Sequence, residues 1–311
     1  MPLIYFAAPA LWPEYAPHLA PALAAAGVAG ARIITEAPDP DAVDYIVHAP
    51  GPGAIGDFTP FRRVRAVLSL WAGVEWIRDC PTLTQPLCRM VAPGMTEGMV
   101  EWVTGHVLRH HLGMDAHILN PGHRWDPHCP PLARDRPVTV LGAGALGLAA
   151  ARSLAALHFP VTVWGRRPRS HEGLASEHGP EGMARALGRA QIVVTLLPLT
   201  PATENILDAR ALALLPKGAV IVNPGRGALI DDDALIAALD SGQIGHATLD
   251  VFRTEPLPPD HPFWTHPRVT VTPHVAAATR PADAAPVLAE NIRRGEAGLA
   301  FLHLVDRTQG Y

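Results

Sequence analysis

The chain has 311 residues, the length of about two ordinary domains. Hydrophobic residues make up 48% of it and charged residues only 17%, which excludes a chain that is disordered throughout. The net charge of −4 disfavours a nucleic-acid or membrane-surface binder, because either would need a basic field. Among the 25 basic residues only Lys217 is a lysine, so an arginine here is informative only through its position.

The start of the chain and the cysteines indicate a cytoplasmic protein. The first residues, MPLIYFAAPALW, have no basic segment before the apolar run, so they predict a β-strand rather than a signal peptide. The sequence contains no run of about 18 apolar residues, so we expect no membrane span. Cys80, Cys88 and Cys129 lack metal-type spacing and suit a reducing compartment. We therefore expect neither a metal site nor a membrane partner.

The first part of the chain alternates strand-like runs with helix-like segments. The strand-like runs are LIYFA, ARIIT, DYIVHA, RAVLSLW and RMVA near residue 90. This alternation predicts a parallel sheet covered by helices. Residues 97–119 have apolar positions at helical spacing and predict one long helix. The proline-rich stretch 120–136 predicts a wrapping loop or linker.

The second part restarts the same alternation. PVTVLGAG predicts a strand and ALGLAAARSLAAL the helix that follows it. Further strands are predicted in VTVWG, QIVVTLLPL, AVIVNPG, HATLDVF and VTVTPH, before a final helix. This pattern is typical of a complete doubly wound α/β domain.

The clearest motif of the second part is a glycine-rich turn between its first strand and first helix. It consists of Gly142, Ala143, Gly144, Ala145, Leu146 and Gly147. Gly142 allows the tight turn, Gly144 lets a pyrophosphate approach the backbone, and Gly147 lets the helix pack close to the strand. The phosphates would then contact the free N–H groups at the helix N-terminus. The motif predicts a dinucleotide site.

The next strand end bears on which dinucleotide is bound. An NAD enzyme usually has Asp or Glu here for the ribose 2′-hydroxyl, but this chain reads Trp164, Gly165, Arg166, Arg167. No acid is present to repel a phosphate, and two planar guanidinium groups suit a 2′-phosphate. We therefore expect NADP(H) as the preferred cofactor, with NAD(H) still open.

Further candidate residues follow the ends of the later strands. They are Leu197, Pro198 and Thr203, then Pro224, Gly225 and Arg226, then Asp250 and Glu255, and last His274. In an open α/β sheet ligands bind at the carboxyl ends of the strands. We therefore expect Arg226, Glu255 and His274 to meet in one cleft, with the other residues of this set near the cofactor.

These three residues suit the reduction of a 2-keto acid. Arg226 can bind the carboxylate and the carbonyl oxygen through its planar fork. His274 can supply the proton that the carbonyl oxygen takes up, and Glu255 beside it would favour the imidazolium form. The proposed chemistry needs no metal.

The motifs NPGRG, LDVFRTEPLP and TPHVA resemble those of the D-isomer-specific 2-hydroxyacid dehydrogenase family, and so does the spacing between them. Within the family, LGAGALG, WGRR, LLPLTPAT and the terminal DRTQGY most resemble the bacterial glyoxylate/hydroxypyruvate reductase A branch. The resemblance implies that His274 is the acid/base, Glu255 its partner and Arg226 the substrate anchor. It also implies that Asp250 lies near the nicotinamide carboxamide.

The resemblance further implies an α/β fold with two Rossmann-like lobes, one flavodoxin-like and one dinucleotide-binding, with parallel sheets and an active-site cleft between them. Residues 1–97 and 278–311 would form the substrate-binding domain, and residues 98–277 the NAD(P)-binding domain. A loop containing Trp71, Ala72 and Gly73 would bind the substrate carboxylate through backbone N–H groups. Trp71 is larger than the residue usual at its position, which leaves the substrate size open.

The resemblance also implies a homodimer through the helix 97–119. Met99, Trp102, Val103, Val107 and Leu108 give this helix more apolar surface than one lobe needs. The expected function is NADPH-dependent reduction of small 2-keto acids such as glyoxylate or hydroxypyruvate to D-2-hydroxy acids.

Two kinds of alternative remain. One is a non-catalytic dinucleotide sensor of the corepressor type, which would not need the His–Glu pair. The other is a dehydrogenase of the same family for formate, phosphite or phosphoglycerate. The Glu–His pairing disfavours formate, and the lack of an added regulatory domain disfavours phosphoglycerate. Phosphite stays open.

Overall fold

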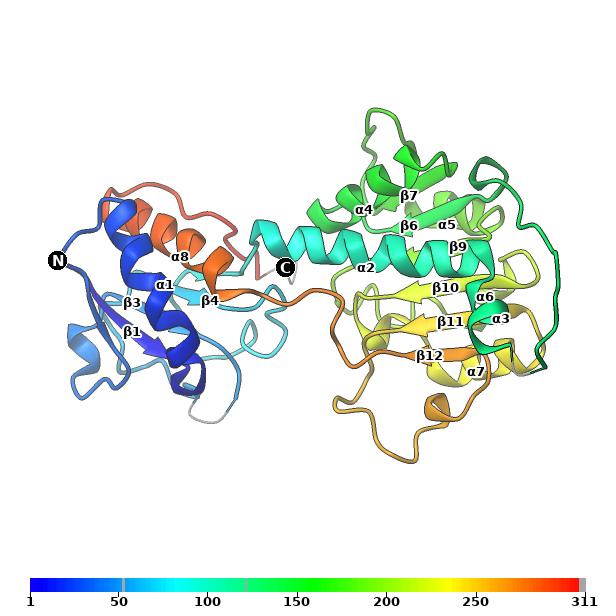
Figure 1. Cartoon of the computed structure of the whole chain (residues 1–311). Helices are drawn as coiled ribbons and strands as arrows, with labels where there is room; N and C mark the ends of the chain where they lie inside the picture. Colours follow the sequence, from blue (N-terminus) through cyan, green and yellow to red (C-terminus); the bar gives the residue numbers. More distant parts are fainter. Residues whose placement is uncertain (52–53, 121, 308–311) are drawn as a thin grey trace. The chain divides into compact units, whose positions relative to one another are not determined.

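The structure is a computed structural model that describes residues 1–51, 54–120 and 122–307. The chain forms two compact units, drawn together in Figure 1. Unit 1 consists of Met1–Met95 and Ala278–Tyr311, and unit 2 consists of Thr96–Ala277. Unit 1 is therefore built from both ends of the chain, and unit 2 from the continuous stretch between them.

Unit 1 is an α/β unit with one parallel sheet in the order β2-β1-β3-β4-β5. Its strands are β1 (Leu3–Ala7), β2 (Arg32–Ile34), β3 (Tyr45–His48), β4 (Ala66–Ser69) and β5 (Leu87–Cys88). All residues of β3 and β4 are buried, as expected for central strands covered on both faces.

Helices α1 (Trp12–Ala25) and α8 (Pro281–Glu296) pack against each other on one face of this sheet (Figure 1). A hydrophobic core of unit 1 includes residues from the strands and from the loops that follow β3 and β4, among them Phe58, Phe61 and Ile77. Two short 3₁₀ turns, η1 (Pro9–Leu11) and η2 (Pro40–Ala42), complete the regular structure of this unit.

Unit 2 has a seven-stranded parallel sheet in the order β12-β11-β10-β9-β6-β7-β8. Its strands are β6 (Val138–Leu141), β7 (Val161–Gly165), β8 (Ala175–His178), β9 (Ile192–Thr195), β10 (Ala219–Asn223), β11 (Ile244–Leu249) and β12 (Val269–Val271). The order reverses at β6, which places the first strand of the unit beside β9 and creates a topological switch point.

Helices cover both faces of this sheet. Residues of α2 (Pro93–Leu112) and α4 (Ala145–Ala156) form one core with the strands, and residues of α5 (Gly179–Leu187), α6 (Ala209–Ala213) and α7 (Asp232–Asp240) form the other. The remaining elements are α3 (Met114–Leu119), η3 (Ala133–Asp135), η4 (Gly227–Leu229) and η5 (Pro262–Trp264). The α/β fold with parallel sheets agrees with the fold class expected from the sequence.

Two local expectations were wrong, and one strand was not expected. The strand expected in RMVA lies at Leu87–Cys88, and the helix that follows begins at Pro93. The helix expected at 97–119 is broken at Gly113, whose φ of 63° cannot continue a right-handed helix. The edge strand β8 was not predicted at all.

The apolar residues of α2 do not form a free surface. Met99, Val103 and Val107 are buried in the core of unit 2, and Trp102 and Leu108 pack against the same core. Exposed apolar side chains lie further along, on α3 and in the stretch after it, where Ile118 and Leu119 are each 73% exposed and Trp125 is 96% exposed.

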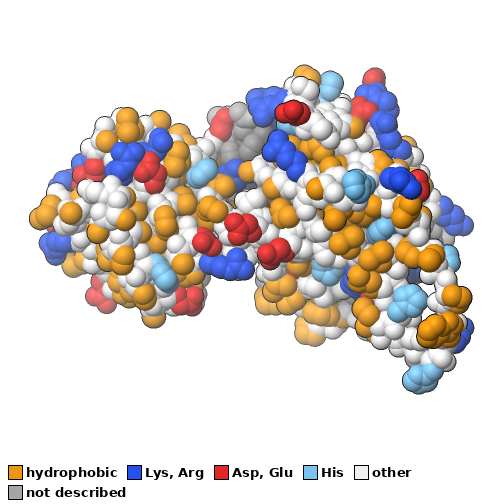
Figure 2. All heavy atoms as spheres, turned by 45° about the horizontal axis from the view of Figure 1, so that its top comes forward, with side chains coloured by type: hydrophobic (Ala, Val, Ile, Leu, Met, Phe, Trp, Pro, Cys, Tyr) orange, Lys and Arg blue, Asp and Glu red, His pale blue; other side chains and the backbone are white. Residues whose placement is uncertain are grey.

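Charged side chains of both signs are interspersed on the face shown in Figure 2. Among the described residues, no helix is both long and apolar enough to cross a membrane. Of the terminal DRTQGY motif only Asp306 and Arg307 lie within the described residues.

Candidate active site

His274 and Glu255 form a hydrogen-bonded pair in unit 2. Nδ1 of His274 lies 2.7 Å from Oε2 of Glu255, and the backbone N–H of Phe252 donates to the other carboxylate oxygen at 2.8 Å. The two side chains are 52% and 34% exposed. The carboxylate is thus fixed at both oxygens, and Nε2 of the imidazole is the nitrogen that is not engaged with Glu255.

The backbone holds His274 in an uncommon conformation. His274 lies three residues beyond the end of β12 and has a φ of 54°, which is left-handed and rare for a residue other than glycine. Its N–H donates to the carbonyl oxygens of Asp250 at 2.9 Å and Thr272 at 3.0 Å. A strained backbone held by hydrogen bonds at a strand end is a common property of functional positions.

Asp250 organises this turn. Its side chain is fully buried and accepts hydrogen bonds from Thr272 Oγ1 at 2.5 Å and from the N–H groups of Val275 and Ala276 at 2.9 Å. Both carboxylate oxygens are therefore engaged within the chain. These contacts fix the segment on both sides of His274, and the expected position near the nicotinamide carboxamide stays a prediction.

Arg226 lies on a second turn, built around buried Asn223. The Asn223 amide oxygen accepts from Thr195 Oγ1 at 2.5 Å and from Gly225 N–H at 3.0 Å, and its amide nitrogen donates to Arg226 O at 3.0 Å. Pro224 and Gly225 are buried in this turn. At Gly227 a Cβ atom would lie 2.0 Å from the carbonyl carbon of Phe252, so this glycine lets the Arg226 turn approach the segment that leads to Glu255.

Strand pairing explains why these turns lie together. Asn223 pairs with Leu249 and Leu249 with Val271, so β10, β11 and β12 end at the same level of the parallel sheet. The residues that follow these strands are thereby brought to one edge, as the sequence predicted for Arg226, Glu255 and His274.

The glycine-rich turn follows β6 at the same edge. A Cβ atom at Gly142 would lie 2.4 Å from Leu196 O, and one at Gly147 would lie 1.9 Å from Gly142 O. The fold itself therefore requires these two glycines. Gly144 is different, because a Cβ atom there would meet no described atom within 4 Å. Its open side, before the N-terminus of α4 with Ala145 and Leu146, fits the approach of a phosphate.

The end of β7 lies beside this turn. A Cβ atom at Gly165 would lie 3.1 Å from that of Ala143, so a larger residue would crowd the glycine-rich turn. Arg166 and Arg167 follow and are exposed.

Trp164 is only 7% exposed and its Nε1–H donates to Gly179 O at 2.9 Å, so its ring belongs to the core rather than to an open binding surface. His178 pairs with Gly165 in the sheet register and is an exposed neighbour that the sequence did not suggest.

The turn after β9 is closed by Thr203. Its hydroxyl donates to Pro198 O at 2.7 Å and accepts from Thr200 N–H at 2.8 Å. Leu197 packs against the core of unit 2. Thr203 therefore shapes this turn, which follows the strand next to β6.

The loop expected to bind a carboxylate lies in unit 1, directly after β4. Trp71 is 47% exposed and its N–H donates to Ser69 Oγ at 3.0 Å. Among the described residues no acceptor is found for the N–H groups of Ala72 and Gly73. Two successive N–H groups without an acceptor suit a carboxylate oxygen.

The polar residues that support the turns were not singled out from the sequence. Thr195 and Asn223 end apolar strands and Thr272 follows one, and this position was the available signal. No group of three or more His, Cys, Asp or Glu side chains in the described part of the chain is arranged to hold a metal ion.

The family model for the NAD binding domain of D-isomer specific 2-hydroxyacid dehydrogenases matches residues 106–276. The chain belongs to this family. The matched segment lies within unit 2 and contains the glycine-rich turn, Arg226, Glu255 and His274.

Solved structures agree with this assignment. A D-isomer specific 2-hydroxyacid dehydrogenase from Xanthobacter autotrophicus Py2, in complex with NADPH and MES, is 39% identical with a TM-score of 0.91, over 100% of this chain and 99% of that chain. An NADPH-dependent glyoxylate/hydroxypyruvate reductase from Sinorhizobium meliloti, in complex with NADP and sulfate, is 34% identical with a TM-score of 0.86, over 100% and 99%. A probable 2-hydroxyacid dehydrogenase from Rhizobium etli CFN 42, in complex with NADP, HEPES and L(+)-tartaric acid, is 28% identical with a TM-score of 0.87, over 100% and 99%. Like them, the chain is an oxidoreductase with a dinucleotide-binding domain.

Proposed function

We propose that this dehydrogenase reduces small 2-keto acids, such as glyoxylate or hydroxypyruvate, to D-2-hydroxy acids with NADPH. The main support is the contact of 2.7 Å between His274 Nδ1 and Glu255 Oε2, because it leaves Nε2 of the ring for a reactant. The Sinorhizobium meliloti reductase, which the chain resembles over its whole length, acts on such acids.

Each proposed role follows from the chemistry of a side chain. When bound, the nicotinamide supplies the hydride that the carbonyl carbon accepts. His274 donates its Nε2 proton to the carbonyl oxygen, so that C=O becomes CH–OH, and Glu255 stabilises the imidazolium before that transfer. Arg226 binds the substrate carboxylate and carbonyl oxygen. The N–H groups of Ala72 and Gly73 in unit 1 bind the carboxylate, which makes unit 1 the substrate-binding unit and unit 2 the cofactor-binding unit.

The test is a kinetic screen of glyoxylate, hydroxypyruvate, pyruvate and bulkier 2-keto acids with NADPH and NADH. Loss of nicotinamide absorbance with small keto acids is the expected result. Tight NADPH binding without turnover of any of these acids would contradict the proposal and favour the dinucleotide sensor.

The preference for NADPH is assigned to Arg166 and Arg167. The absence of an acid at Gly165 leaves nothing there to repel a 2′-phosphate, and the two guanidinium groups follow directly. Replacing both arginines by Gln should weaken NADPH binding about tenfold or more, with little effect on NADH, since a charge-assisted pair is worth about 1.5–3 kcal/mol. Equal losses for both cofactors would contradict this assignment.

Homodimerisation is the last part of the proposal. Met99, Val103 and Val107 are buried in the core of unit 2. We therefore assign the interface to α3 and the stretch after it, where Ile118, Leu119 and Trp125 are exposed. Light scattering should find a dimer, and Ile118→Asp should convert it to a monomer. Leu299→Asp, at a residue that is 49% exposed in unit 1, is the matched control. A wild-type monomer at micromolar concentration would contradict this part.

A further inference from the structure

Trp76 connects two loops at the carboxyl edge of the sheet in unit 1. Its Nε1–H donates to Gly73 O at 3.1 Å, within the loop that contains the N–H groups of Ala72 and Gly73. The other loop follows β3, the neighbour of β4, and His48 and Ser69 pair at the ends of these two strands. Both loops therefore leave the sheet side by side.

A buried histidine stacks against the indole ring of Trp76. The rings of Trp76 and His48 are stacked, with centroids 5.0 Å apart and planes inclined by 28°. His48 is fully buried, and its Nε2 accepts the N–H of Ile55 at 3.0 Å, which ties down the loop after β3. Burial lowers the pKa of His48 to about 4, so the ring is neutral at physiological pH and can accept this hydrogen bond.

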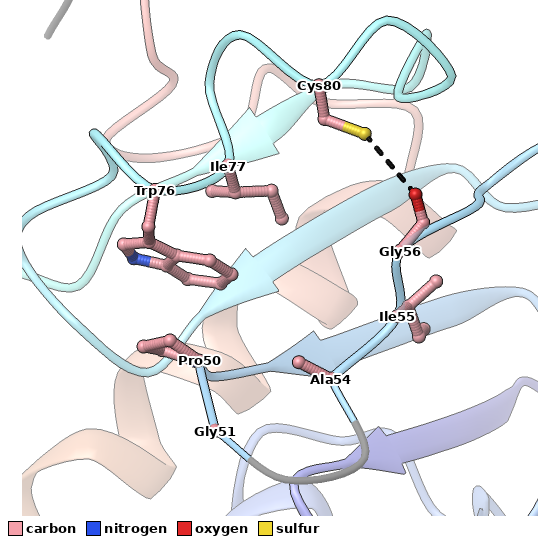
Figure 3. A pocket seen from close by; sticks show the side chains of 8 residues that line it. All are labelled: Pro50, Gly51, Ala54, Ile55, Gly56, Trp76, Ile77 and Cys80. Carbon is pink, nitrogen blue, oxygen red and sulfur yellow. Dashed lines mark hydrogen bonds between the residues drawn. The ribbon is translucent and has the colours of Figure 1, made fainter.

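The rest of the indole is not enclosed. Trp76 is 37% exposed and forms one wall of an open pocket of about 380 Å³. Figure 3 shows Trp76 facing this space, opposite the loop that contains Pro50, Ala54 and Ile55. Among the described residues, the hydrogen bond to Gly73 and the stacking on His48 are the specific contacts that fix the orientation of the ring.

Gly73 is the point where such an anchor matters most. Glycine has more backbone freedom than any other residue, so a glycine that presents an N–H to a ligand has the most freedom to lose on binding. The carbonyl oxygen of Gly73 belongs to the peptide that links Gly73 to Val74. Fixing this oxygen restricts the backbone rotations of Gly73, and these rotations set the direction of the Gly73 N–H. A preorganised donor binds a carboxylate more tightly than a mobile one.

We propose that Trp76 is a positioning residue for the substrate carboxylate, which it never touches: it holds Gly73 so that the N–H groups of Ala72 and Gly73 stay directed at one point. This inference rests on the proposed function. The proposed function assigns carboxylate binding to the loop, and the inference adds which residue orients the loop for that role.

The test is Trp76→Phe, which keeps an aromatic ring on His48 and removes the donor to Gly73. The expected result is a KM for the keto acid about threefold to tenfold higher, the range that one lost hydrogen bond gives, with kcat and the Kd for NADPH nearly unchanged. Trp264→Phe is the matched control, because Trp264 is also exposed and its Nε1–H donates to a backbone carbonyl, that of Pro258, at 2.9 Å in unit 2. An unchanged KM in Trp76→Phe, or an equal rise in Trp264→Phe, would overturn the inference.

Hydrogen exchange provides a readout that does not need activity. Backbone amides of residues 71–75 should exchange faster in Trp76→Phe than in the wild type and in Trp264→Phe. Unchanged exchange in this loop would overturn the inference even if the wild type is an active reductase. If the wild type reduces no keto acid, faster exchange in Trp76→Phe would still support the anchoring while the proposed function fails.

Discussion

The left-handed backbone at His274 determines which substitution can test its role. At a φ of 54°, alanine is strained, whereas asparagine adopts this conformation more readily than most residues. His274→Asn therefore removes the proton donor with the least disturbance of the turn. We expect kcat to fall by about 100-fold or more, the range of general acid–base catalysis, with the Kd for NADPH unchanged, measured by steady-state kinetics and cofactor titration.

His158→Asn is the control for this variant. His158 is exposed in the same unit and has a φ of 70°. The control therefore places asparagine in the same left-handed backbone conformation, away from the turn of His274. It should leave kcat unaltered. Turnover near the wild-type level in His274→Asn would contradict the acid/base role.

Glu255→Gln separates charge from hydrogen bonding at the same pair. Glutamine can still accept the N–H of Phe252, but it no longer offsets the positive charge of the imidazolium. Reduction consumes a proton from the ring, so kcat/KM should fall in the variant while the Kd for NADPH stays unchanged. Steady-state kinetics and cofactor titration check this, and a kcat/KM equal to that of the wild type would show that the carboxylate charge is irrelevant to catalysis.

At the scale of the elements, the glycine-rich turn joins β6 to α4. Close packing requires glycine at Gly142 and Gly147, but not at Gly144. Gly147→Ala should lower the Tm of the protein without cofactor, because its Cβ would overlap Gly142 O. Gly144→Ala should leave that Tm unchanged and instead reduce the rise in Tm that NADPH produces. Thermal unfolding with and without NADPH measures both effects, and a drop in Tm from Gly144→Ala alone would contradict the division of roles.

The success of the sequence prediction varied with how apolar each element is. Central strands such as β6, β9 and β10 were predicted because they are short, fully buried runs of valine, isoleucine and leucine. The strand β8 was missed because an edge strand reading ASEH has no such pattern. The break between α2 and α3 was missed because a glycine within an apolar helical pattern does not reveal its φ.

The same limit applies to the site. His274, Glu255 and Arg226 were predicted because each follows a strand end, and parallel strands end at one edge. The engagement of Asp250 with Val275 and Ala276 was not predicted, because it depends on how the turn around His274 folds back. The same holds for Trp164, since a tryptophan at a strand end can face either the core or a ligand.

At the scale of the whole molecule, buried neutral histidines make stability depend on pH in both units. Burial lowers the pKa of His48 in unit 1 to about 4, that of His110 in unit 2 to about 3, and that of His246 in unit 2 to about 4. In the unfolded chain each titrates near its ordinary value of about 6.5. As the pH falls below that value, the unfolded chain binds protons that the folded one does not, so the free energy of unfolding decreases.

For His48 the loss should reach about 3 kcal/mol by pH 4. Urea unfolding between pH 7 and pH 4.5 should show a steady decline, which His48→Asn reduces. Carboxylates such as Glu290, whose pKa Arg293 and Arg294 lower to about 2, weaken the fold mainly below their ordinary value, so they add little to the decline in the upper part of this window. A flat profile from pH 7 to pH 4.5 would contradict the prediction.

The division of unit 1 between the two ends of the chain also affects how the protein is made. During synthesis, unit 2 is complete once Ala277 has left the ribosome, so it can fold as a unit at that stage. Residues 1–95 leave first, but α1 still lacks α8, which buries Leu288 and Ile292 in the finished unit. The first segment of unit 1 is therefore completed only after unit 2 has been made, and the face of α1 that packs on α8 stays uncovered until Glu296 emerges.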